Sequence, residues 1–402
     1  MDMGQRLFFF PFLLRQSKRP IPTQKSHFLM EEPKMKTIPN TMKKLLALVL
    51  ALSLCLALAA CGSGKAEPQS NAADAADTAS DAPANEPANT AAGENTEPAS
   101  GDTAEYTVAI VKQLDHASLD EIANAIAAEL DAIAAEKNVT INYKIYSGQN
   151  DQSTLQQIGN QAIGDGVDVI IPIATMAAQV MTACAEERKT PVIYAAISDP
   201  ETAELTGIDY VSGTSDMLNT AFIMDMMLAI NPEIKTVGLL YSLSEANSIT
   251  PIAQAKAYLD GKNIAYKEYT GNTNDEVISA VSVMCSDGVD AAFTPTDNVI
   301  MAAELATADT MIDAGIPHYA GADSFVRNGG FATCGVNYTD LGTKTADLAY
   351  QAVTEGMDGM EDYYLMDGGI ITVNTETAAA LNVDYAAFAD MGELVEVTTT
   401  ED

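Results

Sequence analysis

The chain has 402 residues, and its 56 acidic and 21 basic side chains give a formal net charge of −35. So strong a negative charge repels nucleic acid and anionic membrane surfaces, and we expect no nucleic-acid partner. Of the five cysteines, Cys184, Cys285 and Cys334 are far apart in the sequence and odd in number, which fits neither a disulfide framework nor a metal motif. We predict that these three are free, buried thiols.

The segment from Met42 to Cys61 predicts export from the cytoplasm. Two lysines precede an apolar run that is too short for a comfortable transmembrane helix, which needs roughly 20 apolar residues. The run ends in Leu58-Ala59-Ala60-Cys61, which resembles a bacterial lipobox. We therefore predict a lipoprotein signal peptide at 42–60 and a lipid on Cys61 that anchors the protein outside the cytoplasm, on the bacterial cell membrane. An uncleaved anchor, or an ordinary signal with a chance cysteine, is the alternative.

The segments on either side of this signal are not expected to fold. A signal must lie at the N-terminus to work, so residues 1–41 are interpreted as an extension from a mis-called upstream start, with a genuine extra segment as the alternative. Residues 61–104 contain almost only small and polar residues, without one aromatic or large aliphatic side chain after Cys61. Such a composition cannot offset the entropy of ordering, so we predict a disordered tether.

From Glu105 onward, short β-rich runs alternate with stretches of helical periodicity. The first half predicts strands at 106–111, 139–146, 167–173, 191–197 and 208–211, with helices at 117–136, 153–163 and from the end of the third strand through Arg188. The second half predicts strands at 236–241, 264–269, 291–294, 317–320 and 331–336, with helices at 249–261 (closed by glycine), between 269 and 291, at 299–314 and at 341–354. A helix between successive strands predicts parallel sheets with right-handed crossovers.

The repetition of this pattern predicts an α/β protein with two lobes, each a doubly wound parallel sheet, joined by hinge crossovers. We expect the first lobe to comprise 105–216 and about 338–362, and the second about 217–337 and 363–392. Ligands of parallel α/β sheets bind beyond the carboxyl ends of the strands. Two such sheets would therefore face each other across a ligand-binding cleft.

The residues that follow the predicted strands are unusually polar. Serine, threonine and asparagine there are also typical helix N-caps, so a purely structural role is the alternative at each position. A helix N-terminus with free N–H groups can hold a carboxylate, while an acidic side chain can accept a hydrogen bond from an ammonium group. A cleft that offers both suits a zwitterion, and the pattern therefore predicts an amino acid as the ligand.

Six of these segments resemble the substrate-binding proteins of bacterial ABC importers, in the family described as tryptophan/tyrosine transport substrate-binding proteins. They run in order through the body: QLDHASLD at 113–120, AISDP at 196–200, SGTSD at 212–216, LYSLSEANS at 240–248, PTDN at 295–298 and GVNYTDLG at 335–342. The resemblance implies the type I periplasmic-binding-protein fold with two lobes and three crossovers. It also implies a permease and an ATPase as partners, and the family name implies an aromatic amino acid as the ligand.

Transferring the family's cleft to this sequence gives ten candidate ligand-binding residues: Gln113, His116, Thr175, Ser198, Ser244, Glu245, Asn247, Thr296, Asp297 and Asp323. Thr175 and Ser198, with nearby backbone N–H groups, would hold the ligand carboxylate. Asp297 or Asp323 would accept from its ammonium group.

Three further side chains have two open interpretations each. Tyr241 or Phe325 would flank an apolar ligand side chain, or would lie in the core or at the cleft rim. His116 would be a pH-sensitive ligand contact, or a loop histidine with a structural role.

Catalytic motifs are missing from the body of the sequence. It has no Gly-x-Ser-x-Gly elbow, no Walker loop, no Gly-x-Gly-x-x-Gly after the first strand and no Cys/His metal spacing. We therefore expect no enzyme, no catalytic residue, no cofactor and no metal. The predicted function is a monomeric binding protein that closes its lobes over a small solute and delivers it to an importer. A ligand sensor for a membrane kinase is one alternative, and a sugar or nucleoside binder, disfavoured by the lack of tryptophan, is another.

Overall fold

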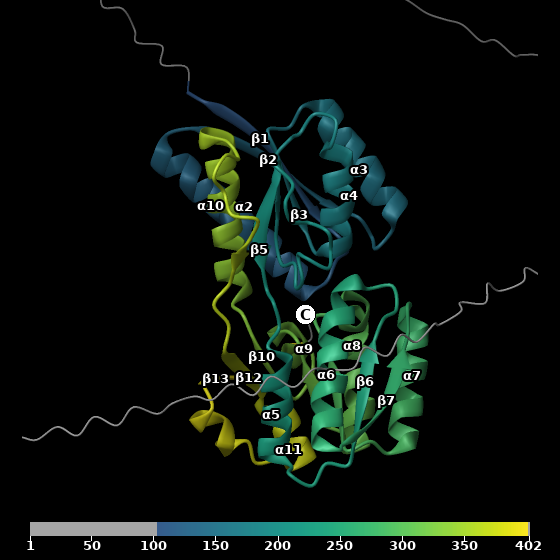
Figure 1. The fold of residues 1–402 in the computed structure, drawn as a ribbon. Helices are drawn as coiled ribbons and strands as arrows, with labels where there is room; N and C mark the ends of the chain where they lie inside the picture. The colour runs from purple at the N-terminus through teal and green to yellow at the C-terminus, as the bar shows by residue number, and fades with distance from the viewer. Residues whose placement is uncertain (1–102, 401–402) are drawn as a thin grey trace, which may run out of the picture. The chain divides into compact units, whose positions relative to one another are not determined.

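The computed structural model of the chain describes residues 103–400, which belong to one compact unit (Figure 1). The predicted extension at 1–41, the signal peptide, Cys61 and the tether as far as residue 102 lie outside the described residues. Within residues 103–400, no helix is both long and apolar enough to cross a membrane. The described residues form two α/β lobes, each built on its own sheet, and this confirms the predicted fold class.

The first sheet has six parallel strands in the order β11-β5-β4-β3-β1-β2. Its strands are β1 (Glu105–Lys112), β2 (Thr140–Ser147), β3 (Val169–Ile173), β4 (Val192–Tyr194), β5 (Val211–Ser215) and β11 (Tyr364–Leu365). Its helices are α2 (Ala117–Lys137), α3 (Gln152–Asp165), α4 (Thr175–Ala185) and α10 (Tyr338–Glu355). The predicted alternation of strands and helices in this half is confirmed.

The fifth strand differs from the prediction, because β5 begins at Val211, where the predicted strand ended. All five of its residues are buried, although three carry hydroxyl groups. The Ser212 hydroxyl donates to the carbonyl oxygen of Glu361. The Thr214 hydroxyl forms a hydrogen bond with the hydroxyl of Thr345. These distant partners satisfy two of the three buried hydroxyl groups, whereas the Ser215 hydroxyl has no partner among the described residues.

The second sheet has seven strands in the order β13-β12-β10-β9-β8-β6-β7. Its strands are β6 (Thr236–Tyr241), β7 (Ala265–Thr270), β8 (Ala291–Thr294), β9 (His318–Ala320), β10 (Ala332–Gly335), β12 (Ile370–Asn374) and β13 (Glu393–Val397). Its helices are α5 (Thr220–Ile230), η1 (Ala246–Ser248), α6 (Ile249–Lys262), α7 (Asn274–Asp287), α8 (Asn298–Asp313), α9 (Asp323–Arg327), α11 (Thr375–Leu381) and η2 (Ala386–Asp390).

The chain passes between the sheets three times: from β5 to α5, from β10 to α10 and from β11 to β12. The third passage enters β12 directly, without a crossover helix, so β12 runs antiparallel to β10. The expectation of wholly parallel sheets is therefore wrong at this one pair. The first sheet also takes in β11, just beyond the expected end of the first lobe at 362, and β13 extends past residue 392.

Helix α6 does not end at Gly261, as the sequence suggested. It continues to Lys262 and is closed by Asn263, whose left-handed backbone (φ 58°) lets its N–H bond to the carbonyl oxygens of Leu259 and Asp260. Asparagine is the commonest substitute for glycine in this conformation.

The three cysteines of the described residues are free, as predicted. Cys334 is buried, whereas Cys184 and Cys285 are only half-buried. The expectation of three fully buried thiols therefore holds for one of them.

Helices α10 and α2 lie side by side against the first sheet (Figure 1), and Gly342 is where they approach most closely. A Cβ on Gly342 would lie 2.6 Å from the Cβ of Ala125 and 2.8 Å from the carbonyl oxygen of Ile122. We expect Gly342→Val to force the helices apart and lower the free energy of unfolding by about 1–3 kcal/mol in urea denaturation. The matched control is Gly261→Ala on α6, where a Cβ meets nothing within 4 Å. Equal stability of the two variants would argue against this close contact.

Candidate functional site

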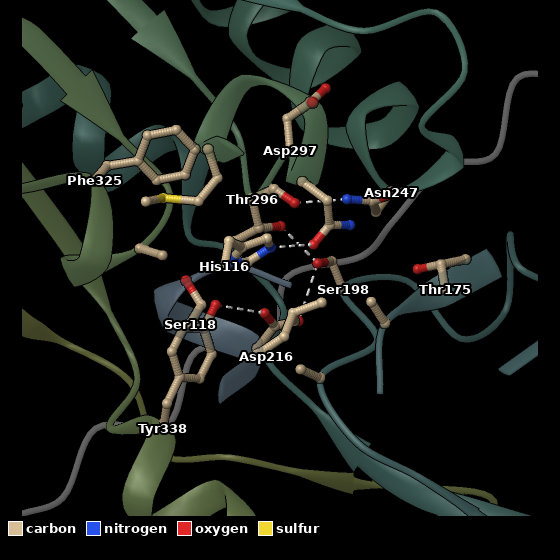
Figure 2. Close-up of a pocket in the computed structure, with 16 residues that line it drawn as sticks. His116, Ser118, Thr175, Ser198, Asp216, Asn247, Thr296, Asp297, Phe325 and Tyr338 are labelled. Atoms are coloured by element: carbon tan, nitrogen blue, oxygen red, sulfur yellow. Dashed lines mark hydrogen bonds between the residues drawn. The ribbon is translucent and has the colours of Figure 1, made fainter. Parts of the chain in front are cut away.

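One cavity collects the carboxyl ends of strands from both sheets (Figure 2). Its lining follows β1, β3, β4 and β5 of the first sheet and β6, β8 and β9 of the second, with the start of α10. The empty space, including space open to solvent, is about 360 Å³, but only about 20 Å³ of it is wide enough for a water-sized group, so the cavity of this closed arrangement is nearly filled by its own side chains. The lining residues are His116, Ser118, Leu119, Ala174, Thr175, Ala196, Ser198, Asp216, Asn247, Thr296, Asp297, Asn298, Met301, Ala322, Phe325 and Tyr338.

Asp216 is a buried carboxylate in this cavity, and its neighbours are neutral. Its Oδ1 accepts from the Ser198 hydroxyl at 2.9 Å and its Oδ2 from the Tyr338 hydroxyl at 3.1 Å (Figure 2). No lysine, arginine or histidine of residues 103–400 forms an ion pair with it. Burial raises the pKa of the Asp216 carboxyl, because two hydroxyl donors only partly replace water. The cavity therefore holds a carboxylate that lacks a cation.

The start of α4 points a helix N-terminus at the same cavity. Ala174, directly before it, has φ 75° and ψ 162°, and Ala196 after β4 has φ 58°. Such conformations are costly for residues with a Cβ, by about 1–3 kcal/mol each, and they concentrate at functional sites. Thr175, the first residue of α4, is buried and lines the cavity beside these two residues. The positive end of the helix dipole makes this a suitable seat for an anion.

The remaining wall of the cavity is apolar. Leu119, Met301, Ala322 and Phe325 line it, and Phe325 lies on the opposite side of the site from Thr175 in Figure 2. Tyr241, the other aromatic candidate, does not line the cavity, because its hydroxyl donates to Glu268 near the surface. The site thus combines an acidic group, a helix N-terminus and an apolar wall.

His116 is held in its neutral form. Its Nε2 lies 3.1 Å from Oδ1 of Asn298, and its Nδ1 is buried with no partner among the described residues. Burial lowers the pKa of His116 to about 4. At neutral pH an Nε2–H therefore donates to the Asn298 oxygen, a tautomer inferred from the acceptor it faces.

Several hydrogen bonds cross directly from one lobe to the other. Ser198 and Thr296 share a bond of 2.8 Å between their hydroxyls, and Thr250 donates to Asp199 at 2.6 Å. Further bonds join His116 to Asn298, Gln113 to Glu245 and Ser118 to Ser324. The lobes are therefore in contact on both sides of the cavity, in a closed arrangement.

The ten candidate residues fall into three groups. Six line the cavity: His116, Thr175, Ser198, Asn247, Thr296 and Asp297. Gln113, Ser244 and Glu245 line a smaller neighbouring space that shares Asn247 with the cavity. Asp323 lines neither, and its Oδ2 accepts from Nε of Arg327 at 3.0 Å.

Asp297 lines the cavity, but its oxygens are already engaged. Oδ1 accepts from the backbone N–H groups of Val299 and Ile300, and Oδ2 from the Ser242 N–H and the Ser248 hydroxyl. Asp297 is therefore the N-cap of α8, a structural role that the sequence analysis had not considered for this residue. A role for Asp297 as the ammonium partner stays a prediction, and its contacts do not favour it.

Four polar lining residues were not among the candidates: Ser118, Asp216, Asn298 and Tyr338. Each belongs to one of the segments that carried the family resemblance, at 113–120, 212–216, 295–298 and 335–342. The signal for them was therefore present, but nothing in the sequence ranked them above their neighbours.

Two such sheets, connected by three chain crossings, hold the cavity between them. This arrangement defines a two-lobed solute-binding protein of the type I periplasmic-binding-protein fold. The family model described as ABC transporter substrate binding protein matches residues 107–387, and the chain belongs to this family. Membership confirms the predicted family and an extracytoplasmic protein. It also confirms that the chain is not an enzyme, because the family binds solutes.

Individual relatives agree with this assignment. The "Tyrosine-binding protein" of Clostridioides difficile is 28% identical over 281 residues, which are 69% of this chain and 81% of that protein. A Streptococcus pneumonia ABC domain, solved in complex with L-Trp, is 27% identical, with a TM-score of 0.65 over 73% of this chain and 100% of the other. A ligand-free, open Clostridium difficile substrate-binding protein is 25% identical, with a TM-score of 0.55 over the same shares.

Proposed function

We propose that the protein is a lipid-anchored receptor that captures an aromatic amino acid and delivers it to an ABC permease and its ATPase. The binding protein named for tyrosine and the structure with L-Trp support the ligand class. The predicted lipid on Cys61 and the tether would hold the receptor at the cell membrane, within reach of the permease.

The observation that carries the proposed ligand class is the Asp216 carboxylate without a cation. An ammonium group placed against the buried Asp216 would supply the missing charge through short, charge-assisted hydrogen bonds. Ser198, which donates to Asp216, would orient that carboxylate, whereas Thr175 and the N-terminus of α4 would hold the ligand carboxylate. The two charged ends of a free amino acid thus find partners on different elements.

The ligand side chain would lie against the apolar wall. Phe325 and Met301 come from the second lobe and Leu119 from the first, so an aromatic ring would be covered from both sides only in the closed form. Phe325 is itself fixed by an edge-on contact with His318, with ring centroids 6.0 Å apart and planes at 89°. A rigid apolar wall favours an aromatic ligand over a sugar.

Delivery would work by lobe closure about the three crossing segments. The closed arrangement of this structure agrees with its greater likeness to the L-Trp complex than to the ligand-free, open relative. Contacts from both lobes exist together only in the closed form, so ligand would shift the equilibrium toward it by its differential affinity. The permease would then recognise the closed form.

The test of this proposal is a calorimetric titration of the purified protein with L-tryptophan, L-tyrosine, L-phenylalanine and representative sugars and nucleosides. We expect saturable binding of at least one aromatic amino acid and no heat from the sugars or nucleosides. The chain has no tryptophan, so the fluorescence of bound L-tryptophan, excited where tyrosine absorbs little, gives an independent readout without tryptophan emission from the protein. Binding of a sugar alone, or of none of these amino acids, would remove the proposed ligand class.

A further inference from the structure

A chain of hydrogen bonds joins the two lobes beside the ligand cavity. From the first lobe, Nε2 of Gln113 donates to Oε1 of Glu245 at 2.8 Å. In the second lobe, Nδ2 of Asn298 donates to Oε2 of Glu245 at 2.6 Å, and its Oδ1 faces Nε2 of His116, back in the first lobe. The backbone N–H of Met176 bonds to Oε1 of Gln113 and fixes the direction of that amide. The chain thus runs from the first lobe to the second and returns.

Glu245, at the centre of this chain, lies outside the ligand cavity. It is 3% exposed and lines a separate space of about 250 Å³. Asp297 at the start of α8 is the charged group that faces it, and His116 at the start of α2 reaches it through Asn298. Residues of α4 and η1 that line the same space contribute no charged side chain, and no cation of residues 103–400 pairs with Glu245.

We propose that Glu245 is a proton-linked latch, which holds the lobes closed through Gln113 and Asn298 without touching the ligand. The proposal rests on the proposed function, because lobe closure is the step on which the latch acts. It gives Glu245 and Gln113 a role in affinity that is distinct from ligand contact.

Burial and the neighbouring charge of Asp297 raise the pKa of Glu245 to about 7. When the lobes part, Gln113 leaves, water reaches Glu245, and its pKa returns toward 4.5, the ordinary value of a glutamate. The closed form therefore binds a proton more readily than the open form, and closure becomes more favourable as pH falls through about 7. Above that pH the carboxylate is ionised in both forms, and closure carries the full cost of burying the charge.

Two neighbours shape this response. His116 acts with the opposite sign, because burial lowers its pKa from 6.5 to about 4, so protonation of the open form opposes closure below pH 6.5. Between pH 6.5 and 8.5 the two oppose each other: Glu245 favours closure at pH 6.5 by about fourfold, whereas His116, half protonated in the open form at that pH, disfavours it by about twofold. Protonated Glu245 keeps both bonds if Asn298 turns its amide around, since neutral His116 can accept at Nε2 in its other tautomer.

The first test measures the affinity for L-tryptophan by calorimetry at pH 6.5 and 8.5. A closed-form pKa of about 7 for Glu245, together with the opposing effect of His116, predicts binding about twofold tighter at pH 6.5 than at pH 8.5. Glu245→Gln, which is neutral throughout, leaves the His116 response alone and should bind about twofold more weakly at pH 6.5 than at pH 8.5. The control is Glu233→Gln, an exposed glutamate of the same lobe that should keep the wild-type ratio. A wild-type ratio near one, or a Glu245→Gln variant with the wild-type ratio, overturns the latch.

A second measurement needs no ligand, so the latch and the proposed ligand class can fail separately. Small-angle scattering of the ligand-free protein should show a smaller radius of gyration at pH 6.5 than at pH 8.5, and Glu245→Gln should remove or reverse the difference, because only His116 then titrates. The same radius at both pH values in the wild type would overturn the latch and leave the proposed ligand untouched. Gln113→Met, which removes the partner across the cleft and leaves Glu245 in place, should also flatten the response, and it replaces Glu245→Gln should that variant not fold.

Discussion

Asparagine in place of Asp216 is expected to weaken binding of an aromatic amino acid by about 30-fold to 1,000-fold, or roughly 2–4 kcal/mol. Neither carboxylate of the cavity, Asp216 or Asp297, pairs with a cation within residues 103–400, but four donors of its own lobe hold Asp297, whereas the two partners of Asp216 are hydroxyl groups. Asparagine has nearly the same shape and can still accept from one hydroxyl, but it brings no charge to the ligand ammonium. Calorimetry with L-tryptophan or L-tyrosine measures the loss.

The same substitution should have the opposite effect on the ligand-free protein. Because burial disfavours the ionised form of Asp216, a neutral side chain should leave the thermal midpoint unchanged or raise it. Asp313→Asn, at an exposed acid on the second lobe, is the matched control and should alter neither affinity nor stability. If Asp216→Asn binds as tightly as the wild type, Asp216 is not the ammonium partner.

Asp216 also shows how far the sequence determines the site. The segment 212–216 carried part of the family resemblance, yet the sequence favoured Asp297 and Asp323 as ammonium partners. The hydrogen bonds of Asp216, Asp297 and Asp323 distinguish these three carboxylates. Asp297 accepts from four groups of its own lobe and Asp323 pairs with Arg327, whereas Asp216 meets only hydroxyls in the cavity. Residue type and strand position place all three near a cleft, but tertiary contacts decide which charge stays unbalanced.

The fold was more predictable than the site. Its elements were predicted well where the hydrophobic pattern of the local sequence matches the burial of the residues. Apolar runs such as β1 and β6 lie within a residue of their predicted bounds, because both faces of a parallel strand are covered. Helix α5 was missed because it is apolar nearly all round, which leaves no helical periodicity to detect. β5 was misplaced because two of its three hydroxyls are bonded by residues more than a hundred positions away.

The contact between Gln113 and Glu245 in the proposed latch could not be predicted from the sequence either. Gln113 and Glu245 were both candidates from the sequence, but they are 132 positions apart and meet only when the lobes close. A strand-end position predicts that each faces the cleft. It cannot predict that they bond to each other in a space beside the cavity, because that depends on how one lobe lies against the other.

Asp297→Ala should lower the free energy of unfolding by about 2–4 kcal/mol, which urea denaturation of the ligand-free protein would measure. Loss of an N-cap costs roughly 0.5–2 kcal/mol, and alanine would also leave the buried N–H of Ser242 and hydroxyl of Ser248 without their acceptor, at about 1–3 kcal/mol for a buried unpaired group. Helix α8 and the end of β6 would loosen together, because one carboxylate ties both.

Asp297→Asn provides the graded comparison, since its amide oxygen can still cap α8 while its NH₂ faces the Ser242 N–H. We expect a loss of stability smaller than that of Asp297→Ala. Removing the charge of Asp297 should also lower the pKa of Glu245, because repulsion between the two carboxylates helps to raise it. The pH response of binding would then weaken in Asp297→Asn even where the fold is intact. Conversely, an Asp297→Ala variant that is as stable as the wild type but has lost its ligand would make Asp297, not Asp216, the partner of the ammonium group.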